Sequence, residues 1–80
     1  MAKNYSDIYN VIGKNIRKFR IKKGLKQHEL ADELFLSESF IAKLESVTRQ
    51  TISIDTLEKF AEVLDVDIRE FFNKDENNKD

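Results

Sequence analysis

The chain of 80 residues contains no cysteine and a single histidine, His28. Without cysteine, neither a disulfide framework nor a thiolate metal site can form. A lone histidine with no second imidazole fits a solvent-facing helix residue better than a metal ligand or a general base. The sequence also has no glycine-rich phosphate loop and no pair of carboxylates with an evident reason to share a cleft. It therefore predicts no enzyme, no metal and no cofactor.

Proline is absent as well, and glycine occurs only at Gly13 and Gly24. Strand and turn signals are correspondingly few, which favours an all-helical fold. No apolar run approaches the length that spans a bilayer, and the N-terminus lacks the charged-then-apolar layout of a signal peptide. We expect one soluble cytoplasmic domain with no membrane partner and with a core near the lower limit of what folds alone.

The net charge is only −1, but the charge is unevenly spread along the chain. Residues 1–28 carry eight basic residues against one acidic residue, a balance of +7. The remaining residues carry six basic against fourteen acidic residues, a balance of −8. This asymmetry is compatible with one basic face that meets DNA and a solvated acidic remainder. The alternative is that lysine-rich helix faces simply keep the protein soluble.

The most informative stretch is Gln27 to Glu45, QHELADELFLSESFIAKLE, which has the pattern of two short helices joined by a tight turn. Apolar residues recur at the spacing of one helix face on both sides of the break, with Leu30, Ala31 and Leu34 before it and Ile41 and Leu44 after it. Ser37 is a good N-cap for the second of these helices. The small Ala31 permits a close crossing of the two. The pattern indicates a helix-turn-helix, and the alternative is an ordinary helical hairpin with an alanine in its contact.

The flanking segments add a family resemblance. IGKNIRKFRIKKGLKQHELADEL runs into LSESFIAKLE and then into SIDTLEKFAEVLDVDIREFF. Over residues 11–72 this order resembles the lambda-repressor/Cro-like, or Xre, helix-turn-helix family. The resemblance implies an all-α, five-helix DNA-binding domain with the helix-turn-helix at its second and third helices. On this interpretation residues 1–10 are an N-terminal extension joining the first helix, and residues 73–80 are a polar disordered tail.

Helical spacing and caps predict where the other helices begin and end. The first should run from about residue 7 to residue 23, and Gly13 inside it costs ~1 kcal/mol against Ala, so we expect fraying or a bend ahead of Gly13. The fourth should follow the N-cap Ser53 and end at Asp65, because aspartate tolerates a left-handed backbone. A fifth should begin at Asp67.

Two residues depart from the pattern of the family. Lys26 stands at the N-cap of the second helix, where Ser or Thr is usual, and an ammonium group cannot accept the free N–H groups. Either the cap is simply poor, or the cation is kept there to reach a DNA phosphate. Phe35 stands at the turn where Gly is usual, at a cost of ~1–2 kcal/mol if the backbone there is left-handed. Either the ring is buried enough to offset this cost, or the turn differs slightly.

The resemblance also implies which residues meet the bases of DNA. Glu38, Ser39 and Lys43 match base-reading positions of the third helix, and Phe40 lies beside them. Lys43 can donate to guanine, and Glu38 can accept from cytosine. Ser39 suits several base edges. Phe40 either meets a thymine methyl group or packs into the core.

Other residues are expected at the DNA backbone. In related repressors a glutamine at the position of Gln27 binds the backbone, and Lys26 precedes it. In the loop after the third helix, the fork of Arg49 matches phosphate geometry and Gln50 can donate as well. The alternative is a surface loop with no role.

Two structural contacts follow from the same resemblance. Phage repressors pair a glutamate at the position of Glu45 with an arginine at the position of Arg20. A buried pair would tie the first helix to the third, and removing one partner would cost ~3–5 kcal/mol. An exposed pair would contribute under ~1 kcal/mol. The C-terminal region forms a two-fold dimer contact in related repressors, with Ile68 and Phe72 as candidates here, and the alternative is ordinary core closure.

Two functions from different classes follow. The leading hypothesis is a transcriptional regulator, a repressor or an autoregulatory controller, that binds a palindromic double-stranded DNA operator as a homodimer. The second is a helix-turn-helix fold used mainly to hold a protein partner, with weak DNA binding. The acidic remainder of the chain and Glu38 on the third helix motivate this second hypothesis.

Overall fold

The computed structural model describes residues 6–46 and 50–74, and in that part of the chain every regular element is helical. The elements in order are α1 (Ser6–Lys22), α2 (Gln27–Leu34), α3 (Glu38–Glu45), α4 (Ile54–Leu64) and the 3-10 helix η1 (Ile68–Phe72). This confirms the all-α class. Within the described ranges, no helix has both the length and the apolarity needed to cross a membrane.

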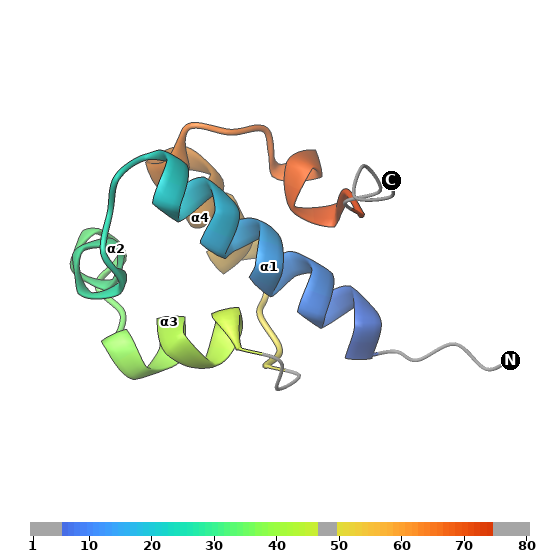
Figure 1. Cartoon of the computed structure of the whole chain (residues 1–80), viewed down its shortest axis with the longest axis horizontal. Coiled ribbons are helices and arrows are strands. Elements are labelled where there is room, and N and C mark those ends of the chain that lie inside the picture. The colour runs from blue at the N-terminus through green and yellow to red at the C-terminus, as the bar shows by residue number, and fades with distance from the viewer. Residues whose placement is uncertain (1–5, 47–49, 75–80) are drawn as a thin grey trace, which may run out of the picture.

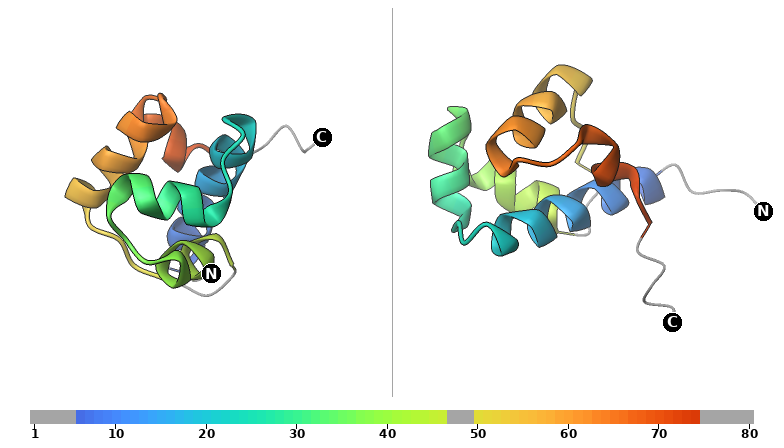
Figure 2. Two further views of the ribbon diagram at one scale, coloured as in Figure 1. Left: turned by 90° about the vertical axis from the view of Figure 1, so that its left-hand side faces the viewer. Right: turned by 90° about the horizontal axis from the view of Figure 1, so that it is seen from above.

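The long helix α1 is the element around which the others are arranged. Figure 1 shows α1 crossing the molecule, with α3 below it, η1 above it and α4 behind it. The second helix, α2, lies across one end of α1, as the two views of Figure 2 also show. The principal contacts of α1 are with α3, α4 and η1, whereas α2 packs against α3 and α4. One helix therefore supports both the helix-turn-helix and the C-terminal element.

The core is built from the apolar stripes that the helical spacing predicted. Its buried apolar residues are Ile12, Ile16, Leu30, Ala31, Leu34, Ile41, Leu44, Leu57, Phe60, Ala61, Leu64 and Phe71. The rings of Phe19 and Phe71 meet edge to face, with centroids 6.1 Å apart and planes at 70°. Such a pair adds ~0.5–1.5 kcal/mol beyond the area that it buries, so it helps to hold η1 on α1.

Gly13 does not interrupt α1, and the fraying expected ahead of this position is wrong. The helix runs without a break from Ser6 to Lys22. A Cβ atom on Gly13 would lie 1.8 Å from the carbonyl oxygen of Leu44, at the end of α3. The missing side chain therefore lets α1 touch the backbone of α3. Packing, rather than a hinge, accounts for this glycine.

The turn between α2 and α3 has the geometry expected of a helix-turn-helix. Phe35 has φ 58° and ψ 40°, and the Leu36 N–H donates to the Ala31 carbonyl at 2.9 Å. The Phe35 ring is 94% exposed, so the suggestion that its burial offsets the cost of the left-handed backbone is wrong. The left-handed backbone is present with Phe at this position, so the cost of ~1–2 kcal/mol applies. Asp65 at the end of α4 is also left-handed, with φ 59°, as expected.

The fifth helix expected from Asp67 onward is not an α-helix but the single 3-10 helix η1. Asp67 caps it, with Oδ1 accepting from the Arg69 N–H at 2.9 Å. Asn15 Nδ2 donates to the carbonyls of Phe71 and Asn73 at 2.8 and 2.9 Å. A side chain of α1 thus supplies a donor for carbonyls at the end of η1, where the backbone leaves them unpaired.

The same contact bears on the expected C-terminal tail, residues 73–80. Asn73, at its start, is tied to α1 through its carbonyl. Residues 75–80 lie outside the described residues.

Candidate nucleic-acid interface

The first turn of α3 carries exposed polar side chains. Ser37 caps the helix, with its Oγ accepting from the Phe40 N–H at 3.1 Å. Glu38, Ser39 and Lys43 are exposed, whereas Ile41 and Leu44 on the opposite face are buried. Helical spacing thus separates a face that meets the core from a face that meets solvent.

Phe40 differs from its neighbours because its ring is half-buried. It packs against the core cluster formed by the buried residues of the four α-helices and η1. Part of the side chain therefore has the core-packing role that the sequence left as an alternative to a thymine contact.

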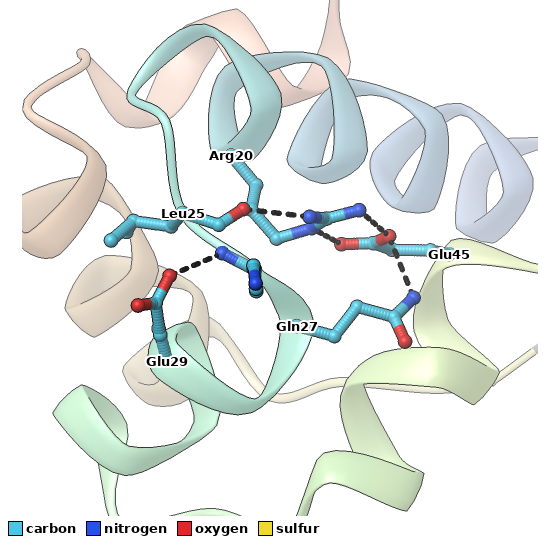
Figure 3. Close-up of polar contacts among 6 residues, drawn as sticks. Arg20, Leu25, Gln27, Glu29 and Glu45 are labelled. Atoms are coloured by element: carbon cyan, nitrogen blue, oxygen red, sulfur yellow. Dashed lines mark hydrogen bonds and ion pairs between the residues drawn. The ribbon is translucent and has the colours of Figure 1, made fainter.

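The start of α2 lacks a capping acceptor on its N-cap residue. Lys26 has an extended backbone, φ −85° and ψ 164°, and its exposed ammonium group cannot accept a hydrogen bond. Its backbone N–H instead donates to Glu29 Oε1 at 2.7 Å, one turn into the helix (Figure 3). This carboxylate also lies where the helix dipole favours negative charge. Glu29 thus supplies half of a capping box, and the lysine side chain is left in solvent.

Behind this helix start, Arg20, Gln27 and Glu45 form one hydrogen-bonded cluster (Figure 3). Arg20 Nε and Nη2 donate to Glu45 Oε2 and Oε1 at 2.7 and 2.8 Å. Arg20 Nη1 donates to the Leu25 carbonyl at 2.7 Å. The side chains of Arg20 and Glu45 are only 10% and 2% exposed. The two residues that the resemblance paired therefore meet in a forked, buried contact that links α1, α2 and α3.

The remaining expected DNA contacts are in the loop after α3. Arg49 lies outside the described residues. Gln50 is half-buried, and its Nε2 donates to the carbonyl of Thr51 at 3.1 Å. In this geometry the amide of Gln50 is engaged within the loop.

The two candidate dimer residues differ in exposure. Ile68 is half-buried against the core, while Phe72 is 39% exposed and its neighbour Phe71 is fully buried. The apolar surface of η1 is thus divided, with Phe71 closing the core and Phe72 partly exposed to solvent.

A surface ion pair caps η1. Arg69 Nη2 lies 2.9 Å from Asp67 Oδ2, and both side chains are exposed. Hydrogen bonds from the Arg69 side chain and backbone lower the pKa of the Asp67 carboxyl to about 2. The same pairing raises the pKa of Arg69. Because the pKa of Asp67 is lowered by folding, the pair's contribution to stability is complete at neutral pH and is lost only as the pH falls toward about 2.

Gly13 and Asn15 are two supporting residues that the sequence reasoning missed. Asn15 had a detectable signal, because it falls between Ile12 and Phe19 on the apolar stripe of α1, where a polar residue needs a partner. It is 3% exposed and has that partner in η1. Gly13 had no such signal, since its role depends on where α3 ends.

Comparisons with known proteins agree with this geometry. A family model described as helix-turn-helix matches residues 16–71. The HTH-type transcriptional regulator SinR of Bacillus licheniformis is 35% identical over 71 residues, which are 88% of this chain and 64% of that protein. The chain thus spans less than two thirds of the length of this relative.

Two solved structures are similar to the whole arrangement. The restriction-modification controller protein C.AhdI from Aeromonas hydrophila has a TM-score of 0.75 and 32% identity, over 85% of this chain and all of that one. The biofilm master regulator SinR, solved in complex with DNA, has a TM-score of 0.70 and 32% identity, over 78% of this chain and 98% of that one. Together with the capped helix pair and the buried Arg20–Glu45 contact, these matches assign the chain to the lambda-repressor/Cro-like (Xre) family of helix-turn-helix regulators.

Proposed function

We propose that this chain is a sequence-specific double-stranded DNA-binding transcriptional regulator, a cytoplasmic repressor or autoregulatory controller that binds a palindromic operator as a homodimer. The observation that carries the proposal is the capped first turn of α3, with Glu38 and Ser39 exposed there and Lys43 exposed in the next turn. The first turns of a recognition helix present side chains to base edges in the major groove. The DNA complex of SinR, a similar structure, supports this use of the fold.

The exposed residues of α3 suit base edges of different kinds. The Lys43 ammonium group can donate to guanine O6 and N7, and the Glu38 carboxylate can accept from cytosine N4. Ser39 can donate or accept. Glu38 would also repel a misplaced phosphate, so it favours specificity over affinity. The half-buried Phe40 leaves only part of its ring for a thymine methyl group.

The DNA backbone would be held beside these bases. Gln27 begins α2, and the exposed Lys26 immediately precedes it. The N-terminus of a helix favours an anion, because free N–H groups and the positive end of the dipole meet there. Arg49 and Gln50, in the loop after α3, are further candidates for backbone contacts, and the Gln50 amide would have to leave its bond to the Thr51 carbonyl to make one.

Selection of bound sequences from a random double-stranded DNA pool tests the proposal. We expect an inverted repeat whose half-sites are one helical turn apart, ~34–36 Å, because two recognition helices related by a two-fold axis read successive major grooves. The selection repeated with Lys43→Ala should lose information at one pair of symmetric positions. Recovery of no motif from the wild-type protein would refute the proposal.

A second candidate function is a protein-interaction module with weak DNA binding. It is favoured by the exposed Glu38 on α3 and by the exposed acidic face of α4, made by Asp55, Glu58 and Glu62. Salt dependence separates the two functions. A protein making roughly 6–10 phosphate contacts gives a slope of about −5 to −9 in log affinity against log salt. A slope near zero would favour the protein partner.

A further inference from the structure

The carboxylate of Glu45 has a third donor besides the two nitrogens of Arg20. Its Oε1 also accepts from Gln27 Nε2 at 3.1 Å (Figure 3). The Glu45 side chain is 2% exposed, so water hardly competes for this carboxylate. The last residue of the recognition helix thus holds the side chain of the first residue of α2.

This bond determines which way the Gln27 amide faces. A carboxylate only accepts hydrogen bonds, so the amide must turn its nitrogen toward Glu45. Rotation by half a turn would place the amide oxygen against a buried negative charge, which is unfavourable. Among the described residues, the Gln27 side chain makes no other hydrogen bond, so one N–H of the amide remains available.

We infer that Glu45 is a positioning residue for DNA binding, which orients the Gln27 amide so that its second N–H is presented to a DNA phosphate. This inference rests on the proposed function. A phosphate oxygen also only accepts, so it requires an N–H rather than the amide oxygen. A side chain that is already held loses less rotational freedom on binding than one that is free. Arg20 fixes the carboxylate in turn through its two bonds to it.

A scan with neutral phosphates tests the inference. Duplexes of the selected operator would carry one methylphosphonate at each position of a half-site in turn. For the wild-type protein we expect one position where neutralisation weakens binding about tenfold, and this loss should disappear in Gln27→Ala. In Glu45→Gln, the loss at that position should also disappear, while losses at other phosphates persist. If Glu45→Gln only made the protein less stable, neutral phosphates would still weaken binding at every position where they do so for the wild type.

The control is Lys26→Ala, which removes the neighbouring cation and leaves the Glu45–Gln27 bond intact. In this variant the neutral phosphate that Gln27 would contact should still weaken binding about tenfold. Retention of the same loss in a folded Glu45→Gln protein would overturn the inference, while the proposed function would stand. Absence of any sequence-selective binding by the wild-type protein would overturn both.

A second measurement needs no variant. The ¹⁵N order parameter of the Gln27 side-chain amide in the free wild-type protein should exceed about 0.6, because the amide is held. A lower value, typical of a mobile side chain, would overturn the inference even if Glu45→Gln fails to fold.

Discussion

At the scale of single residues, α1 carries three positions whose chemistry supports other elements. Gly13 lets the backbone of α3 approach, Asn15 binds carbonyls at the end of η1, and Arg20 holds Glu45. Each contact joins residues far apart in the sequence. Substitutions at these positions should therefore affect elements other than the helix that contains them.

Gly13→Ala gives the most direct test at this scale. In an exposed helix the change would gain ~1 kcal/mol from helix propensity. Here a Cβ would lie 1.8 Å from the Leu44 carbonyl oxygen, which belongs to backbone and has little room to move. Overpacking of this kind costs ~1–3 kcal/mol, so the free energy of unfolding should fall.

Urea denaturation measures this free energy. The control is Lys14→Ala in the same turn of α1, where the side chain is exposed and the expected change is within ~0.5 kcal/mol. A Gly13→Ala protein more stable than the wild type would show that α1 and α3 do not touch here.

At the scale of elements, the position of η1 depends on hydrogen bonds as much as on apolar packing. Five residues form too short a helix to be stable alone. Phe71 buries its ring against Phe19, and Asn15 binds the carbonyls of Phe71 and Asn73. The asparagine thus satisfies groups that the end of the helix leaves unpaired.

Asn15→Ala should loosen η1 without unfolding the helix-turn-helix. Loss of the donor leaves the buried Phe71 carbonyl unpaired, which costs ~1–3 kcal/mol, whereas the carbonyl of the exposed Asn73 can bind water. Amide hydrogen exchange should accelerate at Glu70 and Asn73, whose N–H groups close the turns of η1, and should change less at Ile41 in α3.

Asn15→Asp is a matched variant of nearly the same volume. Its carboxylate would face two carbonyl oxygens with no hydrogen to donate, so it should destabilise more than alanine does. Unchanged exchange at Glu70 and Asn73 in both variants would mean that η1 is held by Phe71 alone.

At the scale of the whole molecule, the two exposed phenylalanines belong to different parts of the fold. Phe35 is in the turn of the helix-turn-helix, and Phe72 is at the end of η1. The family resemblance implies candidate dimer residues on η1, Ile68 and Phe72, and none at the turn. Replacing each phenylalanine by alanine therefore compares the effect of the same change on self-association at two sites.

Phe72→Ala should weaken self-association of the free protein by about tenfold, because a partly exposed aromatic ring is a typical anchor of an interface. Sedimentation equilibrium measures the dissociation constant. Phe35→Ala, which removes a more exposed ring, should leave the constant unchanged. If Phe35→Ala weakened self-association and Phe72→Ala did not, the dimer contact would lie at the turn. An unchanged dissociation constant in both variants would exclude both surfaces.

The sequence by itself determined the helices and most of their ends. The apolar stripes of α1 to α4 predicted the core, and Ser37, Ser53 and Asp67 cap the following helices as expected. These features depend on residues within a turn or two of each other, so local spacing and side-chain chemistry suffice to predict them. The family resemblance, rather than spacing, supplied the pairing of Arg20 with Glu45.

Only the tertiary structure decided which residues of different helices contact one another. The close approach at Gly13, the carbonyls bound by Asn15 and the Gln27 amide bound by Glu45 each depend on how distant helices lie against one another. The fifth helix is a 3-10 helix, and Asn15 of α1 binds the carbonyls of Phe71 within it and of Asn73 just after it. A single sequence encodes such contacts through the packing of the whole core, and no local pattern reports them.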